Sequence, residues 1–347
     1  MSLDPIHPRV EMILSFLKIN NNIEVKNLTK NSKINKINYI TLGFFNLVAF
    51  FKSIKYIKNF SGEIVYITDL QYLPIAIIGK LYKKKVIYET LDNNVELYFY
   101  NLNKRFSFIK SFAFLKSFFK YLEKKVSSIF VDRIIVNSKA LKEYFLPLKS
   151  EIIFYASPFE NKFKINYYLN NVAFLYLGLF NEAKGAKEIL EFTYKYKIKT
   201  FIYGEVQLSE DLKRKFNKLK KEGLIFHKNR LSSFKLQEEL EKLFKLYRLI
   251  GFSLIKDIHY SYATQEANKD IDYMAMGIPF IGNYRIPTKE KIEKGCGVFF
   301  DNLSDIERLF KDKGFYLEKS QQCLNNYEKN YSQTIFKNKL KKIIEEL

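Results

Sequence analysis

The chain has 347 residues, which is too long for one ordinary hydrophobic core and suits two domains. Its 58 lysines and arginines against 37 aspartates and glutamates give a net charge of +21, which favours anionic partners such as nucleic acid, acidic membranes or phosphorylated substrates. The longest uncharged apolar stretch, at 40–51, is too short to span a bilayer, and the two cysteines match no metal or redox spacing.

The first half of the chain alternates short apolar runs with longer amphipathic ones. The expected strands lie near 23–28 and at 63–68, 85–90, 133–138 and 151–156, and the expected helices at 9–19, 44–59, 72–82, 104–126 and 139–146. This alternation predicts βαβ units and a parallel sheet. Because the chain opens on a loop and a helix, the first strand of a doubly wound sheet either precedes this sequence or is missing from the sheet.

The same alternation restarts in the second half. Strands are expected at 173–178, 200–205, 223–228, 249–255, 278–283 and 298–301, and helices at 184–196, 209–221, 234–246, 269–276, 303–311 and 317–346. The least structured stretch, 157–171, is the expected linker between domains at 1–165 and 166–347. The pattern predicts two doubly wound α/β domains facing a central cleft, with ligands bound at the carboxyl ends of the strands.

The most specific motif is NKDIDYMAMGIPFIG at 268–282. Asn268 and Lys269 open a short helix, and Asp270 and Asp272 lie in its first turns, where the helix dipole favours carboxylates. A helix N-terminus beside a lysine is an anion site. An acidic residue one turn further in can accept hydrogen bonds from ribose hydroxyls. The alternative is an ordinary amphipathic helix before a buried strand.

A second motif, YLGLFNEAKGAKEIL at 176–190, reads as a strand, a loop and a helix start. Gly178 allows the backbone to approach a ligand closely. Lys184, at the expected start of the helix, would neutralise a phosphate. Two further loops follow strands of the same half: one carries Gly204 and the other carries Arg230, which is about as readily explained as a surface charge.

Together these motifs resemble the GT-B glycosyltransferases related to family 4. The resemblance implies that Lys184 and Lys269 grip the donor diphosphate, that Asp272 binds the ribose in place of the usual Glu, and that the last helix packs back toward the N-terminal domain. Gly178, Gly204 and Asn268 would line the nucleotide-sugar site, and Arg230 would lie in the base-binding loop. Leu179 stands where the family has Arg, and Thr264 where it often has a second Glu, so we favour Glu266 for the donor-sugar contact.

The N-terminal half carries weaker likenesses to the same family. DPIHPRVEMILSFL resembles its first loop and helix, which makes Arg9 a candidate for phosphate or acceptor binding. YETLDN at 88–93 resembles a strand end at which Asp92 would contact the acceptor. Among the three histidines, His7 is the best catalytic candidate because it lies in a loop expected to face the cleft, although a lone histidine is more often structural.

The resemblance implies a retaining hexosyltransferase that moves a sugar from a nucleoside-diphosphate sugar to a hydroxyl acceptor in surface polysaccharide or glycolipid synthesis. It implies no metal and no cofactor beyond the donor, because no DxD stands at a strand end and cations neutralise the leaving group. One alternative is a sugar-nucleotide epimerase of the same architecture. Another is a basic nucleic-acid-binding protein, for which no binding signature is present, so nucleic acid is not an expected partner.

A basic aromatic segment lies at 104–125. Its apolar residues (Phe108, Phe112, Leu115, Phe119 and Leu122) share one helical face, and four lysines (Lys110, Lys116, Lys120 and Lys124) share another. Such a helix can lie in an acidic membrane interface; the alternative is that the apolar face packs on the sheet, and both can hold. With no signal-peptide pattern at the start, we expect a cytoplasmic protein that visits the inner membrane face to use a lipid-linked or glycan acceptor.

Overall fold

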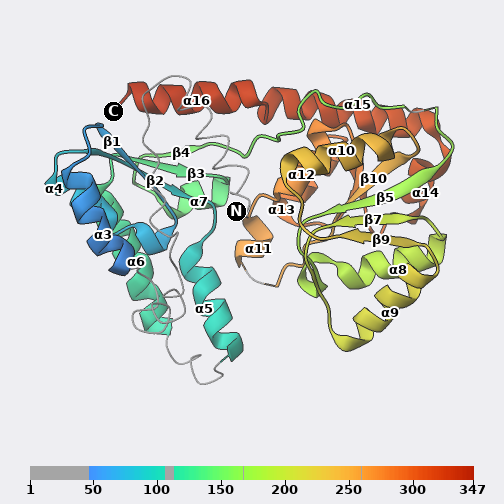
Figure 1. Ribbon diagram of the computed structural model, residues 1–347, viewed down its shortest axis with the longest axis horizontal. Coiled ribbons are helices and arrows are strands. Elements are labelled where there is room, and N and C mark those ends of the chain that lie inside the picture. The colour runs from blue at the N-terminus through green and yellow to red at the C-terminus, as the bar shows by residue number, and fades with distance from the viewer. Residues whose placement is uncertain (1–46, 106–112, 167, 259) are drawn as a thin grey trace. The chain divides into compact units, whose positions relative to one another are not determined.

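The computed structural model describes residues 47–105, 113–166, 168–258 and 260–347 (Figure 1). These residues form two compact units, one built from 155–336 and the other from 47–154 together with 337–347. The division thus falls at 154/155 instead of the expected 165/166, and the last residues of the chain join the N-terminal unit. The helix and strand expected at 9–19 and 23–28 lie outside the described residues.

The N-terminal unit contains a parallel sheet with the strand order β1-β2-β3-β4. Its strands are β1 (Ile64–Thr68), β2 (Lys85–Thr90), β3 (Arg133–Val136) and β4 (Ser150–Ile152). Its helical elements are α3 (Leu47–Lys58), η2 (Leu70–Tyr72), α4 (Ile75–Leu81), α5 (Asn94–Arg105), α6 (Ala113–Phe130) and α7 (Lys139–Tyr144). The predicted alternation of strands and helices is confirmed, and β2 is buried over all but its first residue because helices cover it.

Of the helix expected at 104–126, residues 104–105 and 113–126 are helical, and residues 106–112 lie outside the described residues. The structure has α5 ending at Arg105 and α6 beginning at Ala113. The start of α5 is fixed by Asn93, whose Oδ1 accepts a hydrogen bond from the backbone N–H of Glu96 at 3.2 Å. Asn followed three residues later by Glu is a recognised helix-start pattern, so this helix could have been read from the sequence.

A buried carboxyl group ties α6 to the sheet of this unit. Glu123 on α6 accepts hydrogen bonds from the hydroxyls of Tyr88 on β2, at 2.9 Å, and Tyr144 on α7, at 2.7 Å. Burial raises the pKa of Glu123 to about 7, even though the two hydroxyls and the nearby Lys124 favour the ionised form. The group therefore titrates near neutrality.

The C-terminal unit is built on a six-stranded parallel sheet with the order β12-β11-β10-β5-β7-β9. Its strands are β5 (Val172–Leu177), β7 (Thr200–Tyr203), β9 (Ile225–Lys228), β10 (Arg248–Ser253), β11 (Phe280–Gly282) and β12 (Gly297–Phe299), and a separate pair is formed by β6 (Phe180–Asn181) and β8 (Val206–Gln207). Its helical elements are η4 (Glu182–Lys184), α8 (Ala186–Tyr196), α9 (Glu210–Lys221), α10 (Ser233–Phe244), α11 (Tyr260–Thr264), α12 (Asn268–Ala275), α13 (Ile286–Glu293), α14 (Leu303–Lys311) and α15 (Lys313–Asn330).

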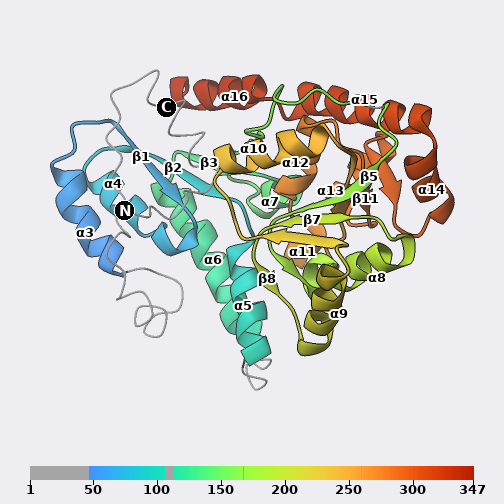
Figure 2. The same ribbon diagram turned by 45° about the vertical axis from the view of Figure 1, so that its right-hand side comes forward.

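The strand order creates a switch point in this sheet. The chain starts at β5, adds β7 and β9 on one side, and then returns to place β10 against the other side of β5. Helices α8 and α9 cover one face of the sheet, and α10 and α12 cover the other (Figure 2). The carboxyl ends of β5 and β10 are therefore neighbours whose following loops diverge, which is where doubly wound sheets bind ligands.

The end of the chain departs from the single helix expected at 317–346. Two helices are present, α15 and α16 (Gln333–Glu345), and Ser332 accepts a hydrogen bond through Oγ from the backbone N–H of Ile335. Residues 337–347 contact the N-terminal unit: Lys339 donates to the carbonyl of Ile152, and Arg133 pairs with Glu346 at 3.5 Å. The predicted return of the last helix to the N-terminal domain is confirmed. Within the described ranges, no helix is long and apolar enough to cross a membrane.

Replacing Glu123 by Gln should flatten the pH dependence of stability. A carboxyl whose pKa is raised by folding stabilises the folded state below its unfolded pKa and loses that contribution as the pH rises through the folded value. Between pH 5 and 8 the wild-type protein should therefore lose roughly 2 kcal/mol of unfolding free energy relative to Glu123→Gln. Urea unfolding at both pH values measures this difference. Glu143→Gln, at an exposed position, is the matched control. The expectation is contradicted if the difference in unfolding free energy between wild type and Glu123→Gln is the same at pH 5 and pH 8.

Candidate nucleotide-sugar site

The loops that follow β5, β7 and β10 meet at one edge of the C-terminal sheet. Gly178 directly follows β5, and Gly204 directly follows β7. A Cβ on Gly204 would lie 2.0 Å from the carbonyl oxygen of Gly178, so the two strand ends can approach this closely only with glycine at 204. Gly185, with a φ of 85°, similarly brings the start of α8 against Leu254 after β10. The predicted motifs therefore lie at the switch point.

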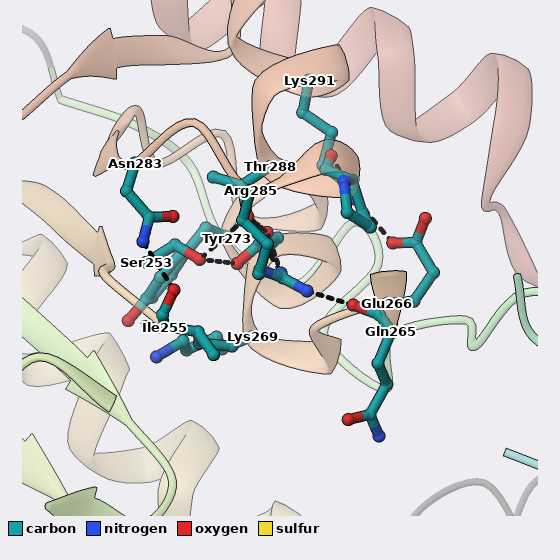
Figure 3. Close-up of polar contacts among 12 residues, drawn as sticks. Ser253, Ile255, Gln265, Glu266, Lys269, Tyr273, Asn283, Arg285, Thr288 and Lys291 are labelled. Atoms are coloured by element: carbon teal, nitrogen blue, oxygen red, sulfur yellow. Dashed lines mark hydrogen bonds and ion pairs between the residues drawn. The ribbon is translucent and has the colours of Figure 1, made fainter. Parts of the chain in front are cut away.

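Asp270 fixes α12 against the neighbouring elements of this edge. Its fully buried carboxylate accepts hydrogen bonds from Ser253 at the end of β10 and, at 2.9 Å, from Thr288 on α13. The guanidinium of Arg285 lies 3.6 Å from the same carboxylate and also donates to Thr288 and to the carbonyl of Gln265 (Figure 3). Burial lowers the pKa of Arg285, which the Asp270 charge partly offsets. These bonds set the position of α12 and of the residues on either side of Asp270.

Lys269 points from the start of α12 to the central strand β5. Its Nζ lies 3.3 Å from the hydroxyl of Tyr176 and 4.3 Å from the centre of that ring, and the Tyr176 hydroxyl donates to the carbonyl of Leu179 at 2.8 Å. Burial lowers the pKa of Lys269 to about 7, and the positive charges of Lys184 and Arg285 add to this effect. An anion bound here would restore the charged form of the ammonium group.

Lys184 is the second cation of this edge. It ends the short helix η4, where its backbone N–H donates to Oδ1 of Asn181 at 3.0 Å, and its Nζ lies 4.4 Å from the centre of the Tyr262 ring. After burial, its positive charge is the next cause of the lowered pKa of Lys269. The structure therefore brings together the two lysines that the sequence assigned to the diphosphate, although they are 85 positions apart in the chain.

Asp272 lies one turn further along α12 and faces a different segment. Its Oδ1 accepts hydrogen bonds from the hydroxyl of Ser157 at 2.7 Å and from that of Tyr155 at 3.1 Å. The residue keeps part of its surface exposed, but the surrounding protein raises the pKa of its carboxyl to about 7, with the charge of Asp270 acting in the same direction. Asp272 is thus an acceptor of hydrogen bonds on the same helix as Lys269.

Glu266, the residue favoured for the donor-sugar contact, forms a buried ion pair. Its carboxylate lies 2.6 Å from Nζ of Lys291 on α13, and both side chains are almost completely buried (Figure 3). Burial by itself would lower the pKa of Lys291, but the adjacent Glu266 outweighs it and the pKa is raised. Thr264, at the alternative position, is half-buried at the end of α11.

The other predicted residues are spread over both units. Asn268 is the first residue of α12 and is partly exposed, and Arg230 is exposed in the loop after β9. Asp92 follows β2 in the N-terminal unit, where its carbonyl accepts a hydrogen bond from Thr90. His7 and Arg9 lie outside the described residues. Across the described part of the chain, no group of three or more His, Cys, Asp or Glu side chains is arranged to hold a metal ion.

Several residues that shape the site were missed by the sequence analysis. Ser253 at the end of β10 and Arg285 and Thr288 at the start of α13 hold Asp270, but the two segments lie more than 30 positions apart, so no local pattern connects them. Helix α13 itself had a usable signal, because Pro287 stands in its first turn. Ser157 lies in the stretch expected to be a linker, and its role depends on a contact with a residue 115 positions away.

Removing Lys291 should leave the buried Glu266 carboxylate without its partner. We expect Lys291→Met to lower the unfolding free energy by about 3–5 kcal/mol. The double variant Glu266→Gln/Lys291→Met should recover most of that loss, because neither charge then remains buried. Urea unfolding measures all three proteins, with the exposed Lys289→Met on the same helix as control. A Lys291→Met protein as stable as the wild type would show that the ion pair does not contribute to stability.

Comparison with known proteins identifies the fold. No family model matches the sequence, and no curated protein matches it. Solved structures do match: TarM from S. aureus, whose complex contains UDP (13% identity, 85% of this chain, TM-score 0.57), and a UDP-GlcNAc 2-epimerase from Neisseria meningitidis (10% identity, 98% of this chain and 96% of that chain, TM-score 0.56). The lipopolysaccharide galactosyltransferase WaaB is similar as well (13% identity, 87% of this chain and 81% of that chain, TM-score 0.52). This chain spans only 60% of the length of TarM. What these likenesses show is that the chain has the GT-B fold, with two Rossmann-like domains.

Proposed function

We propose that this protein is a glycosyltransferase that moves a sugar from a nucleoside-diphosphate sugar to a hydroxyl acceptor. The observation that carries the proposal is that the charge of Lys184 acts on Lys269 at the switch point of the C-terminal sheet, with Asp272 one turn further along α12. Two cations suit a diphosphate, and a carboxylate one turn away suits ribose hydroxyls. The fold shared with glycosyltransferases is consistent with this assignment.

The two lysines of the site suit a reaction in which a diphosphate is the leaving group. The acceptor hydroxyl oxygen bonds to the anomeric carbon, the bond from that carbon to the diphosphate oxygen breaks, and the hydroxyl proton leaves with the diphosphate. Negative charge develops on the leaving oxygen, and Lys184 and Lys269 stabilise it. The resemblance to family 4 favours retention of the anomeric configuration and a hexose donor. Glu266 would orient the donor sugar, while Lys291 holds the Glu266 carboxylate in place.

In the proposed site, Lys269 would compensate for the Leu at position 179, where the family has Arg. Lys269 is held on the Tyr176 hydroxyl, which in turn is anchored to the Leu179 carbonyl, so its ammonium group stays beside the loop after β5. An incoming diphosphate would favour the charged ammonium and raise its pKa from the present value of about 7. Donor binding should therefore be accompanied by proton uptake at Lys269.

A sugar-nucleotide epimerase is the second candidate, because the Neisseria epimerase aligns with nearly the whole chain. Both reactions need a diphosphate site, so the C-terminal residues do not separate them. Incubating the protein with UDP-N-acetylglucosamine and no acceptor does separate them: epimerised sugar in that mixture supports the epimerase. A nucleic-acid-binding role has the net charge of +21 as its only support.

The acceptor is proposed to be a lipid-linked molecule at an anionic membrane surface on the cytoplasmic side. Three of the four lysines expected to face lipid are engaged by the protein instead: Lys116 and Lys120 pair with Glu96, and Lys124 lies 4.7 Å from the centre of the Tyr144 ring. Lys110 lies outside the described residues. Helix α6 presents aromatic side chains outward, with Phe114 78%, Phe118 45% and Tyr121 61% exposed. These three residues fall on one helical face, as in helices that enter a membrane interface. Asp92 and Arg9 remain the predicted acceptor-binding residues, and His7 remains a predicted catalytic residue.

Lys184→Ala should weaken nucleotide binding and activity together. Among UDP, GDP and ADP, a ligand present at about 100 times its dissociation constant should add about 2.7 kcal/mol of stability to the wild-type protein in a thermal-shift assay. Lys184→Ala should lose most of that shift and about 2–4 kcal/mol of transition-state stabilisation. Lys187→Ala, an exposed lysine on α8, is the control and should behave as wild type. No shift with any of the three nucleotides would sink the assignment of the site.

Membrane attachment should depend on the aromatic face of α6. We expect the wild-type protein to co-sediment with vesicles of phosphatidylglycerol and phosphatidylcholine at low salt and less so at high salt. Substituting Phe114, Phe118 and Tyr121 by Ser should abolish binding, whereas substituting Lys116 by Gln should change it little because that lysine is paired with Glu96. Equal binding of the triple variant would contradict this proposal and leave the transferase assignment untouched.

A further inference from the structure

The two carboxylate oxygens of Asp272 are in different situations. Oδ1 accepts two hydrogen bonds, from the hydroxyls of Ser157 and Tyr155. No residue in the described part of the chain donates to Oδ2, and Asp272 keeps part of its surface exposed. An ionised carboxylate accepts about four hydrogen bonds, two on each oxygen, so Asp272 can accept further hydrogen bonds through Oδ2.

Ser157 is itself held firmly by the rest of the C-terminal unit. Its backbone N–H donates to the hydroxyl of Tyr327 on α15 at 3.1 Å, and that hydroxyl donates to Glu160 at 2.9 Å. Its carbonyl accepts a hydrogen bond from the side chain of Gln333 at 3.0 Å. The Ser157 hydroxyl is also buried and accepts from the backbone N–H of Phe159. Because the Ser157 hydroxyl is fixed in this way, its hydrogen bond holds Oδ1 of Asp272 in one position.

We propose that Ser157, assisted by Tyr155, is a positioning residue for nucleotide binding that holds Oδ1 of Asp272 and so presents Oδ2 to the ribose hydroxyls of a nucleoside diphosphate. The inference rests on the proposed function and adds the residues that prepare its ribose contact. Ser157 and Tyr155 do not touch the nucleotide in this account. They act through the carboxylate, which would otherwise be free to rotate.

The same two hydroxyls favour the ionised form of the carboxylate. The groups around it are Asp270 on its own helix, Ser157 and Tyr155 from the preceding segment, and Tyr327 from α15, whose hydroxyl donates to Glu160. Within the described ranges no lysine or arginine forms an ion pair with Asp272, so the hydroxyls of Ser157 and Tyr155 are its stabilising partners. Burial raises the pKa of Asp272 to about 7, and removing Ser157 Oγ should raise it further.

Loss of the Ser157 hydroxyl should weaken the binding of UDP. A protonated Asp272 is a poorer acceptor for ribose hydroxyls than an ionised one. Ser157→Ala should therefore weaken UDP binding about tenfold at pH 7, as expected for a pKa rise of about one unit together with the lost positioning. The loss should shrink at pH 8.5, where the carboxylate of the variant ionises. Ser157→Thr keeps a hydroxyl and should restore most of the affinity.

Isothermal titration of UDP and of 2′,3′-dideoxy-UDP between pH 6 and 8.5 tests the proposal. Wild type, Ser157→Ala, Ser157→Thr and Tyr155→Phe are compared, and the titration of the phosphates cancels because it is common to all the proteins. Ser157→Ala and Tyr155→Phe should lose affinity for UDP but not for the dideoxy nucleotide, which lacks the ribose hydroxyls, and Ser157→Thr should bind both nearly as wild type does. Ser320→Ala removes another buried serine hydroxyl of this unit, bonded to the carbonyl of Gly277, and should leave the pH profile unchanged.

The outcomes separate this inference from the function on which it rests. If Ser157→Ala weakens both nucleotides equally, or neither, Ser157 has no positioning role while the nucleotide site stands. If Ser157→Ala does not fold, Tyr155→Phe decides by the same comparison. If the wild-type protein binds none of UDP, GDP and ADP, the proposed function fails and the inference falls with it. A loss confined to UDP that is greatest at low pH supports it.

Discussion

The arrangement of the C-terminal site depends on the buried carboxylate of Asp270. Hydrogen bonds from Ser253 and Thr288 and the nearby charge of Arg285 attach α12 to β10 and α13. A buried carboxylate is tolerated only where such partners compensate for its lost hydration. Since α12 has only eight residues, this attachment fixes the direction of every side chain on it.

Lys269 and Asp272, which flank Asp270 on α12, therefore contact different partners. Lys269 reaches Tyr176 on β5, and Asp272 reaches Ser157 before the C-terminal sheet begins. Burial shifts the pKa of both groups toward 7, downward for the lysine and upward for the aspartate, because neither has a full complement of charged partners within the described protein. A nucleoside diphosphate carries what each lacks: an anion for the lysine and hydroxyl donors for the carboxylate. Groups with such shifts are characteristic of binding and catalytic sites.

Much of the fold could be predicted from the sequence, because β-branched runs and amphipathic segments report their own burial. The errors have local causes. Residues 317–346 are uniformly helical in pattern, so the break between α15 and α16 was not apparent from periodicity. The aligned lysines of α6 looked like a free face, yet Lys116 and Lys120 are held by Glu96 of α5, a helix the pattern did not predict.

The sequence by itself determined the order of strands and helices and the place of Lys184, Lys269 and Asp272 at strand ends and helix starts, because these depend on residues close together in the chain. Only the tertiary structure decided which charges meet. Glu266 pairs with Lys291, Asp270 with Arg285, and Asp272 with the hydroxyl of Ser157. Such pairs form where the desolvation of a buried charge must be offset by whatever group the fold brings within a few ångströms, and chain topology, not local sequence, sets that distance.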